Sequence, residues 1–460
     1  MKKLFVLTLV LVLGLSSFAL AADNEAEAVQ TGDRNEAYIT QEGDRQFAEV
    51  LQLGDDNFAV IDQAGRDNEA IVGQQGDLNE AFVSQDAEES SSHSLQLGEG
   101  NFLTVTQVGE EHSSGIVQSG EGNFALVDQD GDGEAAAIGQ VGEFNSAYIE
   151  QVGRRDEAEI QQRGSDNVAE IFQSGFGLLF RGYNDADIWQ EGRENHALIM
   201  QFDTGLLFSG FNTGIISQVG DGSWATIYQT SLGLLGRGFN SAEIDQAGDF
   251  HDALISQSGL ANESLVFQRV EGNWAEVYQT GIGNLALAYQ YDSDDEIGIY
   301  QDGDGNIAEV SQGDHLASAG FMEAWVYQDG DDNMATVIQS RGHAYAYVNQ
   351  LGDDNVAYQT QDNETDWGSA WAEIEQEGRG NYAFQSQVSG SGLEAYVYQS
   401  GRNNASWQSQ TNAFQMGATP SIATTTQIGN ENHGSILQTS QSAWASITQT
   451  GDNNLATITQ

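Results

Sequence analysis

A Gln residue recurs every eleven residues, without a slip, from Gln30 to Gln173. The residues between follow one pattern, N-x-A-x-[IV]-x-Q-x-G-x-x, which the stretch from Asn57 to Asp67 illustrates. A short fixed period is typical of repeat proteins, in which each unit packs on its neighbours. The repeat therefore replaces the two or three globular domains that a chain of 460 residues would otherwise suggest.

The alternation within each repeat predicts a β-strand. Asn, Ala, Ile or Val, and Gln occupy every second position over seven residues. Successive side chains of a strand point to opposite faces, so these four share one face, which we expect to point inward. Gly two residues after the Gln, with a neighbouring Asp, is typical of a turn. The predicted turn residues are Gly32, Gly43, Gly54, Asp55, Gly65, Gly352, Asp353, Gly451 and Asp452.

Insertions into the repeat indicate how many strands form one coil. Three of the steps between successive Gln residues after Gln173 are seventeen residues long, with one regular step between each of them. The later insertions also follow repeats of a single parity, so two strands per coil would place each group on one edge. We predict an all-β solenoid with two strands per coil of about 22 residues, and about 18 coils. The expected insertions lie near 174–184, 202–212, 230–240, 313–322, 362–370 and 411–421.

The inward Asn and Gln residues need hydrogen-bond partners. A buried, unpaired polar group costs about 1–3 kcal/mol. Identical amides stacked coil on coil can bond to one another, as in cross-β stacks; capping of turns is the alternative. We predict interior ladders that also serve self-assembly. Their residues are Asn35, Gln41, Gln52, Asn57, Gln63, Asn68, Asn145, Gln151, Gln162, Asn167, Gln173, Asn432, Gln438, Gln449, Asn454 and Gln460.

Composition excludes several function classes. The chain has 69 acidic residues against 15 Lys plus Arg, a net charge of −54, which argues against nucleic-acid binding. The acidity either keeps chains soluble and apart or allows divalent cations to bridge them. Cysteine is absent and the seven His residues are dispersed. Asp302 to Gly305 resembles part of a calcium loop but lacks its downstream Glu. We predict no catalytic residues, no metal site and no cofactor.

The N-terminus predicts export. Residues 1–21 contain Lys2 and Lys3, an apolar run from Leu4 to Leu15, and an A-x-A site, all typical of a secretory signal peptide. The remaining residues, 22–460, then form a repeat domain with no transmembrane segment in the mature chain.

Two surface features are candidates for binding. Seven Trp residues, among them Trp189 and Trp444, fall at outward positions, where they either bury against a partner or pair across strands. The first three insertions share a Gly-Leu-Leu motif, which forms either a docking strip or a small core of its own. The possible docking residues are Leu178, Leu179, Phe180, Leu206, Leu207, Phe208, Leu234 and Leu235.

The run from Gln52 to Gln63, Gln-x-Gly-x-x-Asn-x-Ala-x-x-x-Gln, resembles the curlin repeat of the curli major subunit and its nucleator. The resemblance covers nearly the whole mature chain. It implies an extracellular fibre of a Gram-negative-type bacterium, which builds biofilm matrix and mediates adhesion. It also implies a curli-type nucleator, a chaperone and an outer-membrane pore as partners, and turn Gly and Asp residues that act as gatekeepers against aggregation. The chain differs from curli subunits in having many more repeats and no export-targeting segment before the first.

The sequence predicts a self-assembling structural protein whose uncapped coils stack end to end as a homopolymer. A monomeric solenoid adhesin or binding rod is the alternative. A polysaccharide-degrading β-helix enzyme lacks support, because basic residues are few and no convergent acidic cleft is evident.

Overall fold

The computed structural model describes residues 23–177, 183–205, 211–231, 239–313, 321–363, 369–388, 392–411, 420–440 and 442–460. These residues form strands and the turns between them, divided into two compact units. The first comprises Met1–Gly222 with Gln229–Gly238, and the second comprises Ser223–Tyr228 with Phe239–Gln460. In the part of the chain so described, no helix is long and apolar enough to cross a membrane.

The strands of the first unit follow one another at short intervals. They are β1 (Glu25–Thr31), β2 (Glu36–Asp44), β3 (Phe47–Leu53), β4 (Phe58–Arg66), β5 (Glu69–Asp77), β6 (Glu80–Glu88), β7 (Ser91–Glu99), β8 (Phe102–Glu110), β9 (Ser113–Glu121), β10 (Phe124–Asp132), β11 (Ala135–Glu143), β12 (Ser146–Arg154), β13 (Glu157–Ser165), β14 (Val168–Gly177), β15 (Tyr183–Arg193), β16 (His196–Gly205) and β17 (Phe211–Asp221). Strand β18 (Trp224–Ser231) contributes residues to both units.

The second unit continues the same succession. Its strands are β19 (Phe239–Asp249), β20 (Asp252–Leu260), β21 (Glu263–Glu271), β22 (Trp274–Ile282), β23 (Leu285–Gln290), β24 (Glu296–Asp302), β25 (Ile307–Gln312), β26 (Met322–Asp329), β27 (Met334–Gln339), β28 (His343–Asp353), β29 (Val356–Asp362), β30 (Ser369–Arg379), β31 (Tyr382–Val388), β32 (Leu393–Arg402), β33 (Ala405–Thr411), β34 (Ser421–Asn430), β35 (His433–Gln438), β36 (Trp444–Thr450) and β37 (Leu455–Thr459).

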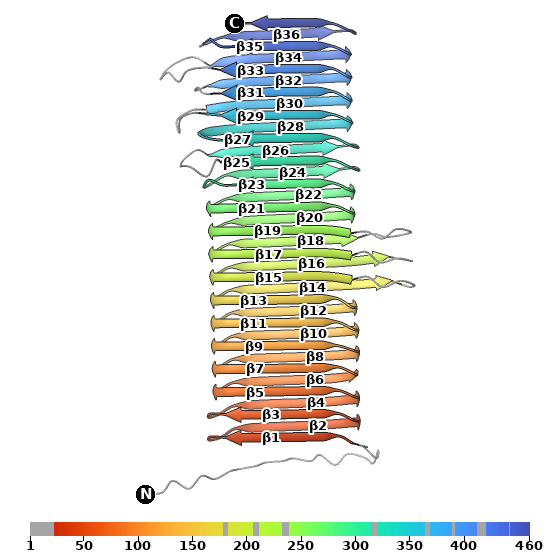
Figure 1. The fold of residues 1–460 in the computed structure, drawn as a ribbon, viewed down its shortest axis with the longest axis vertical. Coiled ribbons are helices and arrows are strands. Elements are labelled where there is room, and N and C mark those ends of the chain that lie inside the picture. The colour runs from red at the N-terminus through yellow and green to blue at the C-terminus, as the bar shows by residue number, and fades with distance from the viewer. Residues whose placement is uncertain are drawn as a thin grey trace. The chain divides into compact units, whose positions relative to one another are not determined.

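Within each unit, parallel pairing joins strands that are two apart in the chain, odd with odd and even with even (Figure 1). Gln30 of β1 lies beside Gln52 of β3, twenty-two residues later. The register is the same on both sides of an insertion. Gln162 lies beside Gln190 although a longer connection separates them. The predicted all-β solenoid with two strands per coil is confirmed. The undescribed segments 178–182, 206–210 and 232–238 follow even strands, and the later long ones follow odd strands.

The core of each coil is thin and built from the predicted inward residues. Ala59 and Ile61 of β4 have no exposed surface, and the same holds for Ala308 and Val310 of β25 in the second unit. Burying an aliphatic side chain contributes about 1.5–3 kcal/mol. Because each coil buries only a few such groups, its stability depends on the coils above and below it.

The corners differ from the predicted turns in one respect. Most strands run to nine or more residues rather than seven, so Gly65 lies in β4 and pairs with Gly43 and Ala87 instead of standing in a turn. Gly54 has φ +128°, and a Cβ there would lie 2.7 Å from the carbonyl carbon of Gly76 on the next coil. The Gly is therefore required by close approach of coils as well as by its backbone angle. The chain reverses at a second left-handed residue, such as Asp56 (φ +59°) or Leu78 (φ +59°).

Candidate assembly elements: amide ladders, turns and aromatic rows

The inward Gln residues form continuous ladders. Gln52 Nε2 donates to Gln74 Oε1 at 2.8 Å and to the Glu36 carbonyl at 3.0 Å. Gln74 donates in turn to Gln96 at 2.9 Å. Every such bond runs from a Gln to the Gln of the following coil. The predicted residues Gln41, Gln52, Gln63, Gln151, Gln162, Gln173, Gln438, Gln449 and Gln460 all take part.

The Asn ladders run in the opposite direction. Asn57 Nδ2 donates back to Asn35 Oδ1 at 3.1 Å and forward to the Gly76 carbonyl at 2.7 Å. The Asn57 backbone N–H also donates to Asn35 Oδ1. Each rung thus satisfies its own amide and a backbone group of the turn. The predicted residues Asn35, Asn57, Asn145, Asn167, Asn432 and Asn454 make Asn–Asn bonds of this kind.

Asn68 departs from this prediction. Its column holds Gln46 before it and Ser90 after it, so it makes no Asn–Asn bond. Its Nδ2 donates to the carbonyls of Ala64 and Ala87, while its Oδ1 accepts from the Ser90 N–H. The rung is satisfied, but by backbone groups. The amide geometry is therefore observed within the chain, whereas its role in assembly between chains stays a prediction.

The turn residues form a third repeated contact. The Asp55 N–H donates to Asp77 Oδ1 at 2.8 Å, and Asp55 Oδ1 accepts from the Asp33 N–H at 2.7 Å. Asp353 and Asp452 accept equivalent bonds. The predicted Gly residues have positive φ, from +101° at Gly451 to +128° at Gly54. No group of three or more His, Cys, Asp or Glu side chains in the described chain could hold a metal ion. The role of the turn Gly and Asp residues as gatekeepers against aggregation stays a prediction.

Aromatic side chains stack along the outward faces within each unit. Tyr278, Tyr300 and Tyr327 lie with ring centroids 5.3 and 4.8 Å apart, in nearly parallel planes. In the first unit, Phe102 stacks on Phe124 at 5.3 Å. Pairing across coils is thus present at these positions. Five of the seven Trp residues placed outward by parity are exposed; Trp189, Trp224, Trp371, Trp407 and Trp444 are 41–69% exposed.

The proposed docking strip lies outside the described residues. This applies to Leu178, Leu179, Phe180, Leu206, Leu207, Phe208, Leu234 and Leu235, and equally to the signal peptide at 1–21.

Sequence reasoning missed three buried acids. Glu134, Asp156 and Asp295 each stand at an Asn rung and are 1% exposed. The signal that could have found them is an acid at the first position of the repeat, which Asn holds in most units.

Gln107 offers a direct measure of one rung. Its Nε2 donates to Gln129 Oε1 and the Ser91 carbonyl, and its Oε1 accepts from Gln85. We expect Gln107→Ala to lower the free energy of unfolding by about 2–4 kcal/mol, because it leaves two buried amides short of a partner and opens a cavity. Gln75→Ala, at an exposed position of β5, should change it by less than about 0.5 kcal/mol. Urea unfolding followed by circular dichroism makes the comparison; equal effects would refute a stabilising ladder.

The fold and ladders define a class: a parallel β-solenoid whose interior amides link each coil to the next. Six segments match the curlin associated repeat, at residues 21–54, 44–76, 54–86, 65–93, 98–131 and 372–401. The chain is therefore a curlin-repeat protein. Both the repeat and the fold are those of structural rather than enzymatic families. No curated protein matches the chain.

Proposed function

We propose that the protein assembles head to tail into an extracellular fibre in which the last coil of one copy pairs with the first coil of the next. The observation that supports this proposal most directly is that the Gln and Asn ladders run in opposite directions. A ladder in which every amide bonds in the same direction presents donors at its last coil and acceptors at its first. The two ends of such a stack are complementary to each other and not to themselves, which favours open, heterologous growth.

The C-terminal coil presents Gln donors. Gln449 Nε2 bonds to the His433 carbonyl and Gln460 Nε2 to the Trp444 carbonyl. In the Gln ladders each Nε2 also donates to the Gln of the following coil, and for these two residues that coil is supplied by another copy. Asn454 Oδ1 is the matching acceptor of its ladder.

The N-terminal coil presents the complementary set. Gln30 and Gln41 donate forward to Gln52 and Gln63. Among the described residues, no donor reaches the Oε1 atoms of Gln30 and Gln41. Asn35 Nδ2 donates forward to the Gly54 carbonyl. In the Asn ladders Nδ2 also donates to the Asn of the preceding coil, which another copy would supply for Asn35.

The strand order sets the register between copies. Strand β37 follows β36, so the next step of the stack lies over β36. There β1 of the next copy would pair, with β2 over β37. Gln449 then donates to Gln30, and Gln460 to Gln41. In the same arrangement Asn35 donates to Asn454. The two ladders and the two sheets continue across the junction.

The family supports the biological setting. Curlin-repeat proteins are of the curli type, extracellular and fibre-forming or surface-associated. We propose the same setting here, with biofilm matrix and adhesion as the role. A curli-type nucleator, a chaperone and an outer-membrane pore are the partners that this role would require.

Purified protein of residues 22–460 tests the proposal. We expect thioflavin fluorescence to rise with a concentration-dependent lag, and aligned fibres to give a meridional reflection at about 4.7–4.8 Å. The single chain already contains this spacing, so sedimentation and electron microscopy must show growth beyond one copy. Persistent monomers after prolonged incubation at physiological salt would refute the proposal.

A further inference from the structure

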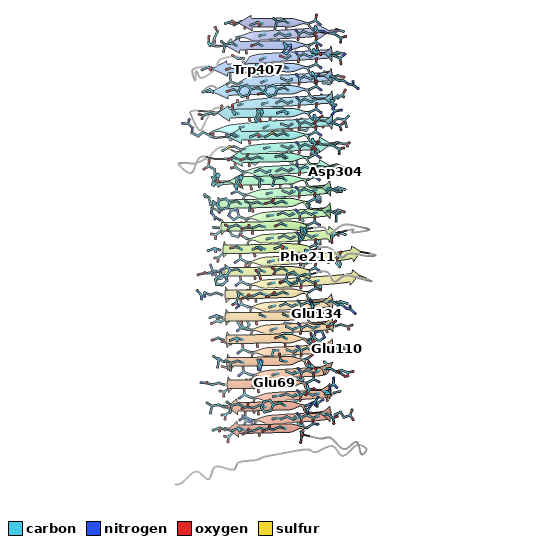
Figure 2. The ribbon with its side chains drawn as sticks, turned by 45° about the vertical axis from the view of Figure 1, so that its right-hand side comes forward. Glu69, Glu110, Glu134, Phe211, Asp304 and Trp407 are labelled. Atoms are coloured by element: carbon cyan, nitrogen blue, oxygen red, sulfur yellow. The ribbon has the colours of Figure 1, made fainter. Side chains whose placement is uncertain are left out.

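One Asn column of the first unit is interrupted by ionisable side chains. His112, Glu134 and Asp156 stand on three successive coils, immediately before β9, β11 and β13 (Figure 2 labels Glu134). Each is 1% exposed. These are the rungs at which the neighbouring columns hold Asn, a side chain with one acceptor oxygen and one donor nitrogen.

Asp156 reproduces only half of an Asn rung. Its Oδ1 accepts from the backbone N–H and the Nδ2 of Asn184, both at 3.0 Å. Asn35 Oδ1 accepts the same pair of bonds from Asn57. The other oxygen, Oδ2, occupies the place of the amide nitrogen and has no hydrogen-bond partner. A carboxylate has no hydrogen to donate there, whereas a carboxylic acid has one and so matches the amide.

His112 and Glu134 need a proton between them. His112 Nε2 lies 3.0 Å from the Val108 carbonyl, which can only accept, so Nε2 carries the hydrogen. Nδ1 of the neutral ring is then an acceptor, and it lies 3.4 Å from Glu134 Oε2. Both side chains are fully buried, and no side chain donates to either oxygen of Glu134; the Gly153 backbone N–H lies near the carboxyl group and favours its charged form. A hydrogen bond forms here only if one proton is held between the ring and the carboxyl group.

Acidic side chains of β10 and β16 face the column. Asp130 and Asp132 of β10 face His112 and Glu134, and Asp203 of β16 faces Asp156. Among the cations of the described residues, Arg154 lies 3.8 Å from Asp132 at the surface, and Arg155 directly precedes Asp156 in the chain.

This environment favours protonated carboxyl groups. Burial, reinforced by Asp156, raises the pKa of Glu134 to about 8. Burial likewise raises the pKa of Asp156 to about 7, with Asp203 adding to the effect. Burial lowers the pKa of His112, so the shared proton resides on Glu134.

The second unit contains an independent instance. Asp295 stands at an Asn rung, where its backbone N–H donates to Asn273 Oδ1 at 2.9 Å. Its Oδ1 accepts from the Met322 N–H at 3.0 Å, while its Oδ2 has no hydrogen-bond partner. Burial, with Asp292 and Asp294 nearby, raises the pKa of Asp295 to about 8.

We propose that Glu134, Asp156 and Asp295 are internal proton-binding sites, in which the bound proton replaces an amide hydrogen of the ladder and closes the coil. Protonated Asp156 donates from Oδ2 as an Asn rung does, and protonated Glu134 donates to His112 Nδ1. Loss of these protons leaves a buried negative charge at each site, with a carboxylate oxygen that no side chain pairs, and loosens the coils that hold it. The inference concerns the folded chain and does not depend on fibre formation.

The direction of the pH effect follows from linkage. The folded state binds these protons more tightly than the unfolded state, because the folded pKa values lie above the ordinary ones. Their stabilisation is complete below the ordinary carboxyl pKa of about 4 and is lost as pH rises through about 7 to 8. Most exposed carboxyl groups have already ionised below this window.

Amide hydrogen exchange of the full chain, corrected for intrinsic rates, tests the proposal. Between about pH 6 and about pH 8.5 we expect protection of β11 and β13 to fall about tenfold or more relative to β3 and β5. Glu134→Gln with Asp156→Asn should remove this fall and raise protection at the higher pH, because amides supply the hydrogen permanently. Glu110→Gln, the same change at an exposed position one coil before Glu134, should leave it intact.

Two results would overturn the inference: parallel pH profiles for β11 and β3 in the native chain, or a pH-dependent fall that persists in the double variant. Infrared spectroscopy of the native chain gives a second measurement if the variant does not fold. Protonated carboxyl bands at about pH 6 should disappear by about pH 9. Their absence at the lower pH would equally refute the inference.

Discussion

Replacing Gly98 with Ala is expected to destabilise the coils around β7 by about 3–5 kcal/mol. Gly98 has φ +119°, and an added Cβ would lie 2.9 Å from the carbonyl carbon of Gly120 and overlap its oxygen. The obstacle is the backbone of the next coil, so a side-chain rotation cannot relieve it. Relief requires β7 and β9 to separate at the corner, which breaks the pairing on which both coils depend.

Gly115→Ala is the matched control. Gly115 lies on the outward face of β9, has no atoms within 4 Å of an added Cβ, and has no left-handed φ. This substitution should be neutral or stabilising by up to about 1 kcal/mol, because it restricts the unfolded chain. Hydrogen exchange of β5 to β9 and urea unfolding measure both variants. If the two substitutions had similar effects, close packing of the glycine corner would not be the reason for the Gly repeat.

The period predicted the strands, their inward face and the coil, because every coil solves the same packing problem with the same residues. Ala59 and Ile61 are buried for the reason their alternation suggests. The pattern also predicted a positive φ at Gly54. A second reason for Gly at this position is contact with the next coil. That contact depends on the distance between coils and on the shape of the corner, which the order of residues along the repeat does not encode.

Other features left no sequence signal. Leu78 and Phe144 have left-handed φ values at the corner, although neither residue type favours them. Their side chains point outward and are more than half exposed, so the repeat leaves the residue type at this position free. The polarity of the ladders is likewise invisible, because an amide can donate in either direction. Glu134 looked like one acid among 69 until the structure placed it, 1% exposed, at a rung that Asn occupies in most other coils.

The second large effect is expected at the C-terminal edge. The Gln460 N–H bonds to the Leu437 carbonyl, and the Thr439 N–H bonds to the Gln460 carbonyl, so Gln460 faces the β35 side. Backbone groups alternate along a strand, so the N–H of Thr457 faces the outer edge of β37. By the same alternation, Ala443 faces β34 and Ser446 faces the outer edge of β36. Ser446 and Thr457 are both exposed.

Ser446→Pro with Thr457→Pro should therefore stop fibre growth while leaving the chain folded. Each Pro removes an N–H that only an incoming copy would use, and places its ring where the next strand must lie. Ser446→Ala with Thr457→Ala keeps both N–H groups and is the control. Circular dichroism and urea unfolding should show similar folding for the two double variants, while thioflavin kinetics should show growth for the Ala variant alone.

The same variant tests the polarity of growth, because its N-terminal coil is unchanged. A copy carrying both Pro residues can still add to the C-terminal end of a native fibre, after which that end presents no usable edge. We expect about one part of the Pro variant in ten of native protein to shorten the fibres markedly, with the Ala variant having no such effect. Electron microscopy gives the length distributions. Unchanged lengths would mean that copies do not join C-terminal edge to N-terminal edge. Vigorous growth of the Pro variant alone would show that the fibre is held by other surfaces, of which the exposed aromatic rows would be the first to examine.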